Sequence, residues 1–119
     1  MDYHEHTERI DGALAKFGGL YTWEDILDGL QRGDMQMFSY ENSFVVTKVS
    51  DYPRKRVLDL MLAYGVKSEL KELESQIVRF AEKVGATTMM ASMSRRGWEA
   101  EMVEGDGWTV VGTMFLKDL

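Results

Sequence analysis

Two acidic residues in the sequence, Asp59 and Glu24, have the chemistry of a general base. Asp59 interrupts an apolar run at residues 57–63, and a carboxylate buried in a strand has a raised pKa that suits proton abstraction. Alternation gives a structural interpretation, in which Asp59 lies on the opposite face from its neighbouring leucines, beside a cross-strand partner such as Lys48. Glu24 belongs to a group of acids around a predicted helix, where it could receive an amine or form a solvated face.

The segment before the longest predicted helix holds residue types that bind anions. Gly65, Lys67 and Ser68 stand where a strand ends and the helix begins. Unpaired N–H groups and the helix dipole attract phosphate at such a junction. The segment has a single glycine, Gly65, and an acid, Glu69, comes directly after Ser68. The pattern therefore predicts weak anion binding.

Arg95 and Arg96 precede Gly97 and Trp98, and they allow two interpretations. Arginine pairs with anions in a bidentate manner, so the group could clamp an anion or a protein partner. The alternative is the start of a helix with two solvated arginines and a core tryptophan. We expect Arg95, Arg96 and Trp98 to form a partner-binding surface.

A metal site is not expected. The chain has no cysteine, and its two histidines, His4 and His6, flank Glu5 near the N-terminus. Two neighbouring ligands at a terminus do not close a metal site, so residues 1–6 are expected to be a flexible, solvated tail.

Composition limits the function classes. A chain of 119 residues with 45% hydrophobic and 29% charged residues is typical of one globular domain, here 1–119. The net charge of −6 with scattered basic residues disfavours nucleic-acid binding. No apolar run approaches the ~20 residues of a membrane span, and the polar N-terminus is unlike a signal peptide. The absence of cysteine fits a reducing compartment, so we expect a cytoplasmic protein.

Hydrophobic periodicity predicts the elements and their order. Helices are predicted at 7–17, 23–33, 68–84 and 94–104, and strands at 35–41, 44–50, 54–63, 87–92 and 108–117. Thr22 is the predicted N-cap of the second helix, with Asp25 in place of the capping-box Glu, and Ser68 is the predicted N-cap of the third. A core-facing stripe is predicted on the third helix, formed by Leu70, Leu73, Ile77, Phe80, Ala81 and Val84. The right-handed crossover through helix 68–84 makes its flanking strands parallel neighbours. The order predicts an α/β (α+β type) fold, with a mixed, mostly antiparallel sheet of five to six strands and helices on both faces.

This order resembles the fold of the GCN5-related N-acetyltransferases over residues 23–116. The local match is a helix that ends at Gly85, a strand, a short helix, and residues 102–108 in the frame of the family's Leu-Tyr-x-x-x-Gly-Phe pattern. Val103 stands at the position of the tyrosine, which is a frequent general acid. Residues 64–69 stand at the family's pyrophosphate-binding signature, with one glycine and no preceding Arg or Gln in register. The family's first strand is not evident.

Two functional hypotheses follow from this resemblance and its departures. The first is a non-catalytic interaction or assembly module without a cofactor, with a protein partner or self-association at the open sheet edge. A small, acidic chain of this fold with Arg95-Arg96-Gly97-Trp98 after the strand at 87–92 also looks like short proteins of tailed bacteriophages. This resemblance implies a virion-associated component, in the cytoplasm of a bacterial host or in the phage particle. The alternative is an N-acetyltransferase that moves acetyl from acetyl-CoA to an amine, with Gly65, Lys67 and Ser68 at the phosphates and Asp59 or Glu24 as base.

Overall fold

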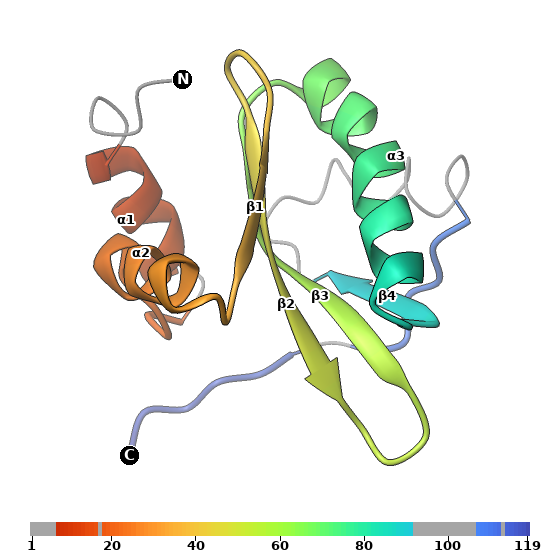
Figure 1. Cartoon of the computed structure of the whole chain (residues 1–119). Coiled ribbons are helices and arrows are strands. Elements are labelled where there is room, and N and C mark those ends of the chain that lie inside the picture. Colours follow the sequence, from red (N-terminus) through yellow and green to blue (C-terminus); the bar gives the residue numbers. More distant parts are fainter. Residues whose placement is uncertain (1–6, 17, 92–106, 113) are drawn as a thin grey trace.

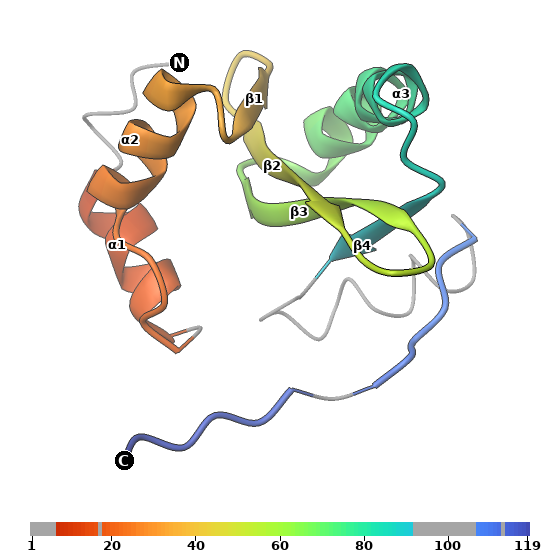
Figure 2. The same cartoon turned by 60° about the horizontal axis from the view of Figure 1, so that its bottom comes forward.

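The part of the chain that the structure describes folds as a four-stranded sheet with helices on both faces. The computed structural model describes residues 7–16, 18–91, 107–112 and 114–119. The elements are α1 (Thr7–Lys16), α2 (Trp23–Arg32), β1 (Gln36–Ser39), β2 (Phe44–Asp51), β3 (Arg56–Tyr64), α3 (Lys67–Lys83) and β4 (Thr88–Ala91). Helices α1 and α2 cover one face of the sheet and α3 covers the other (Figures 1 and 2). The predicted α+β class is confirmed.

The sheet has the strand order β1-β2-β3-β4. β1 and β3 pair antiparallel with β2, and β4 pairs parallel with β3, as the crossover through α3 predicts. The described residues hold four strands rather than five or six. Residues 107–112 and 114–119 form no strand and run as an exposed trace beside the domain (Figure 2). Alternation alone was misleading here, because a strand also needs a neighbour for its N–H and C=O groups. The predicted helix 94–104 lies outside the described residues.

Local signals set the ends of the helices. Thr22 caps α2 through the Asp25 amide, and the Asp25 carboxylate accepts from the Thr22 amide at 2.9 Å, so the predicted capping box is confirmed. Gly33 ends α2 in the left-handed conformation. The prediction that Ser68 caps α3 is wrong. The Val66 carbonyl already accepts from the Leu70 amide at 3.0 Å, so α3 begins at Lys67 and Val66 is its N-cap.

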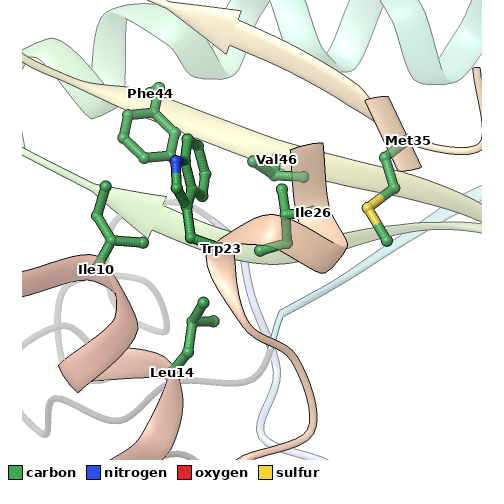
Figure 3. Packing of buried hydrophobic residues seen from close by; sticks show 7 residues of the cluster. All are labelled: Ile10, Leu14, Trp23, Ile26, Met35, Phe44 and Val46. Atoms are coloured by element: carbon green, nitrogen blue, oxygen red, sulfur yellow. The ribbon is translucent and has the colours of Figure 1, made fainter. Parts of the chain in front are cut away.

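Separate hydrophobic cores lie on the two faces of the sheet. On the α1–α2 face, Phe44 is fully buried and its ring lies 5.5 Å from that of Trp23 and 5.4 Å from that of Tyr64. Figure 3 shows side chains of this cluster, which are Ile10, Leu14, Trp23, Ile26, Met35, Phe44 and Val46. On the other face, Leu70, Leu73, Ile77 and Ala81 of α3 pack against Val45 and Leu58. The predicted core stripe of this helix is confirmed.

A bulge interrupts the pairing of β2 and β3. Val46 lies opposite Leu62, but the next residue, Thr47, lies opposite Leu60. Met61 is therefore an extra residue in β3, and such a residue leaves the hydrogen-bond ladder and bends its strand.

The bulge changes which side chains share a face. Leu58 and Leu60 pack on the α3 side as alternation predicts, whereas Leu62 packs on the α1–α2 side with Met61. The prediction that all three leucines share one face is wrong, because the extra residue shifts the alternation after Leu60. Asp59 is unaffected and lies opposite Lys48, as predicted.

Candidate functional site

A hollow of about 270 Å³ opens beside the bulge on the α1–α2 side of the sheet. Its walls come from the end of α1, the loop before α2, the middle of β3, the neighbouring strand β4, and the C-terminal segment. The lining residues are Leu14, Leu20, Tyr21, Asp59, Leu60, Met61, Met90 and Met114. Segments far apart in the sequence thus enclose the side chain that the sequence singled out as a base, and the folded chain alone brings them together.

Asp59 is the titratable acid of this hollow. It is half-buried, with Lys48 as its partner across β2 and Met90 as its partner on β4. Burial raises the pKa of the Asp59 carboxyl above its ordinary value, and the positive charge of Lys48 offsets part of this effect. Within the described residues, no hydrogen bond or salt bridge holds the carboxylate. A carboxylate in this environment can accept a proton from a bound molecule.

Glu24 lies elsewhere. It occupies the first turn of α2, where its negative charge favours the helix N-terminus, and its side chain is exposed. Its neighbour Trp23 enters the core, so Glu24 projects from a different face of the helix and does not line the hollow. The structure places Asp59 and Glu24 in different environments, and of the two it is Asp59 that lines the hollow.

Gly65 connects the strand to α3 in a conformation that only glycine adopts readily, with φ +127°. It lies against the turn between β1 and β2. A Cβ atom at this position would overlap the Ser43 hydroxyl and lie 2.5 Å from the Asn42 carbonyl oxygen. The glycine therefore permits a close approach of two chain segments, a role that the sequence did not predict.

Ser43 and Glu69 fasten this junction. The Ser43 hydroxyl accepts from the Val66 amide at 2.8 Å and lies 3.3 Å from the Glu69 carboxylate, to which it can donate. The other oxygen of Glu69 accepts from the Asn42 amide at 2.9 Å. The sequence placed the Glu69 charge against approaching phosphates, but the carboxylate is bonded to the β1–β2 turn. We call the segment 65–69 with its partners Asn42 and Ser43 the junction.

The exposed edge of the junction belongs to the start of α3. Lys67 and Ser68 are exposed there, and no side chain among the described residues caps this helix end. Gly65, Lys67 and Ser68 therefore lie together at one end of β3, as the sequence predicted. The predicted partner surface of Arg95, Arg96 and Trp98 lies outside the described residues, and so do His4 and His6.

Sequence reasoning missed most of the hollow. Met61 could have been found, because it lies two residues from Asp59 and side chains at that spacing share a face of a strand. Met90 needed the register of β3 and β4, and Tyr21 and Met114 needed the tertiary fold. Met61 also packs against the core on the α1–α2 face.

The described residues lack two further features that would indicate a function. They hold no cluster of three or more His, Cys, Asp or Glu side chains arranged for a metal ion. None of the described helices combines the length and the apolar character that crossing a bilayer requires.

Comparisons with known proteins identify the fold. No protein-family model matches the chain, and no curated protein matches it. Among solved structures, the chain is similar to a probable acetyltransferase, with a TM-score of 0.65 and 17% identity over 96% of this chain and 94% of that one. It is also similar to an aminoglycoside N-acetyltransferase in complex with CoA, with a TM-score of 0.60 and 16% identity over 100% and 97% of the two chains. The chain has a fold like that of the GCN5-related N-acetyltransferases.

Proposed function

We propose that this protein is an N-acetyltransferase that transfers the acetyl group of acetyl-CoA to an amine. The observation that carries the proposal is the position of Asp59, a half-buried carboxylate with a raised pKa at the wall of a hollow beside a strand bulge. The similarity to two acetyltransferase structures supports it through the fold. It replaces the hypothesis of a non-catalytic module or phage component, which nothing in the structure or the comparisons supports.

The junction would hold the cofactor. Gly65, Lys67 and Ser68 are exposed at the start of α3, where amide groups and the helix dipole favour phosphate. Glu69 fits this assignment because its carboxylate is bonded to Asn42 and Ser43 and does not cap the helix. Gly65 follows Asp59 by six positions along the chain, at most about 20 Å in an extended strand, a distance that the long pantetheine arm of CoA must cover.

Asp59 would act as the base at the other end. Bound acetyl-CoA supplies the acetyl group as a reactive thioester. Asp59 takes one proton from the ammonium group of the acceptor and passes it to solvent, which leaves a neutral, nucleophilic nitrogen. The transfer forms an amide bond and breaks the carbon–sulfur bond, and the second proton lost by the nitrogen ends on the CoA thiol. The backbone of the bulged Met61 is suited to donate to the carbonyl oxygen, since bulges free groups from the ladder.

Calorimetric titration with acetyl-CoA tests the proposal. We expect binding in the micromolar range, weakened by Lys67→Glu and unchanged by Glu72→Gln, which alters an exposed acid elsewhere on α3. A complementary thermal measurement should show about 2.7 kcal/mol of stabilisation at 100 times the dissociation constant. Absence of binding at millimolar acetyl-CoA would overturn the proposal.

A further inference from the structure

The hollow beside Asp59 has an uneven distribution of polarity. In the part of the chain that the structure describes, Asp59 is the sole charged side chain that lines it, and Tyr21 adds one phenol. The remaining lining side chains are Leu or Met. A site of this kind attracts one positive charge and otherwise offers apolar surface.

We infer that the acceptor is an amine with a single positive charge on a compact aromatic body, and without a carboxylate or phosphate next to the amine. The inference rests on the proposed acetyl transfer and names the substrate class of that site. The ammonium group would pair with Asp59, and the ring would lie against the thioethers of Met61, Met90 and Met114. Thioether sulfur makes favourable contacts with aromatic rings, particularly at the ring edge.

Polycations fit the hollow poorly. Each additional ammonium group that leaves water needs its own carboxylate, and Asp59 is the single acid among the described lining residues. Lys48, which lies opposite Asp59 across β2, adds a positive charge nearby. Glu24 is exposed on α2 and does not line the hollow, so it cannot serve as a second acid there.

Amino acids and phosphorylated amines fit poorly for the opposite reason. No lysine or arginine is among the described lining residues, and the nearby Lys48 already faces Asp59 across β2, so an acceptor carboxylate would meet the charge of Asp59 without a cation of its own in the hollow. The size of the hollow agrees with a small body. Its volume of about 270 Å³ lies below the ~300–1,000 Å³ of pockets that enclose a drug-sized ligand.

Binding of four small molecules in the absence of acetyl-CoA tests the inference. The probes are 2-phenylethylamine, phenylalanine, 2-phenylethanol and spermine. Phenylalanine adds a carboxylate to the aromatic amine, 2-phenylethanol replaces the amine by a neutral hydroxyl, and spermine carries several amines and no ring. We expect calorimetry to show 2-phenylethylamine binding at least about tenfold more tightly than each of the others, as one charge-assisted pair implies. Tighter or equal binding of spermine or phenylalanine, or no binding of 2-phenylethylamine, would overturn it.

Two variants locate the binding. Asp59→Asn should remove the preference for 2-phenylethylamine over 2-phenylethanol, with the fold checked by circular dichroism. Met90→Lys places a cation across from Asp59 on β4. It should weaken the binding of 2-phenylethylamine and strengthen the binding of phenylalanine. Glu72→Gln, remote on α3, should leave all four affinities unchanged. A preference that survives Asp59→Asn would place the amine elsewhere and contradict the assignment.

The outcomes separate this inference from the proposed function. If 2-phenylethylamine binds as expected while acetyl-CoA does not bind, the proposed transfer fails and the assignment of the hollow as an amine site stands. If acetyl-CoA binds and the protein acetylates spermine or phenylalanine in preference to 2-phenylethylamine, the function stands and the substrate class is wrong.

Discussion

The junction at the end of β3 and the hollow beside its middle are built on opposite principles. At the junction, the polar side chains satisfy one another: Ser43 accepts from the Val66 amide and Glu69 is bonded to the adjacent turn. In the hollow, Asp59 has no hydrogen bond within the described residues and is surrounded mainly by apolar side chains. The difference indicates that internal hydrogen bonds hold the junction together, whereas the hollow presents a half-buried carboxylate to which a ligand can bind.

Gly65→Ala should have the largest effect on the junction. Its φ of +127° is unfavourable for alanine, and the new Cβ would overlap Ser43 and Asn42. Backbone strain and overpacking together should destabilise the fold by about 3 kcal/mol, measured by urea unfolding.

Gly12→Ala is a matched control for this substitution. It lies within α1 and has open space around it, so alanine should be neutral or stabilising there, by up to about 1 kcal/mol. Equal effects of the two substitutions would contradict the close packing of the junction.

Ser43→Ala should have the next largest effect. It removes the acceptor of the Val66 amide and one partner of Glu69, at a fully buried position. We expect a loss of about 1–3 kcal/mol in the free energy of unfolding. A double-mutant cycle with Glu69→Gln should give a coupling of at least about 0.5 kcal/mol, and additivity would show that the two side chains do not act together.

Asp59→Asn should act in the opposite direction and stabilise the protein at neutral pH. Because burial raises the pKa of Asp59 in the folded state, the contribution of Asp59 to stability is most favourable below the unfolded-state value, near 3.8, and falls as the pH rises through the folded-state pKa. The variant lacks this loss. Its advantage at pH 7 should therefore disappear as the pH is lowered below 3.8, in urea unfolding measured across this range.

Asp51→Asn provides a control with the reverse sign. The hydrogen bond from Arg56 holds the pKa of Asp51 below its ordinary value, so its contribution is present at neutral pH and is lost as the pH falls. The Asp51 variant should be less stable than wild type at pH 7 and match it in acid. The same sign for both variants would contradict the assigned environment of Asp59.

Glu24→Gln should have the smallest effect. Its side chain is exposed on α2 and does not line the hollow. We expect a change in stability within about 0.5 kcal/mol and no change in the affinity for amines. A loss of amine binding comparable to that of Asp59→Asn would restore Glu24 as a base and show that the hollow extends to α2.

The sequence predicts those parts of this fold that depend on local signals. The capping box of Thr22 and Asp25, the core stripe of α3 and the parallel crossover follow from spacing within a few residues or from chain handedness. The strand predicted at 108–117 failed because its alternation says nothing of a pairing partner. The bulge at Met61 also escaped, since the apolar run around it reads the same with either register.

The candidate site divides in the same way. Asp59 stood out because a charge in an apolar strand is unusual, and its partner Lys48 followed from the hairpin. The role of Gly65 and the bonding of Glu69 to Asn42 depend on a contact between segments 27 residues apart, which no local pattern encodes. From the sequence, Glu69 was expected to repel phosphate. In the structure its carboxylate accepts a hydrogen bond from the backbone amide of Asn42 in the β1–β2 turn.

Release of the CoA thiol is a direct test of acetyl transfer with Asp59 as the general base. Wild-type protein with acetyl-CoA and 2-phenylethylamine should release thiol well above the uncatalysed rate and form the acetylated amine, detected by mass. Asp59→Asn should lower this rate by about 10²–10⁴-fold, the usual contribution of a general base, while acetyl-CoA affinity is retained. Release at the same rate in the variant would contradict the role of Asp59 as the base. No release above the uncatalysed reaction in the wild type would contradict acetyl transfer to this amine.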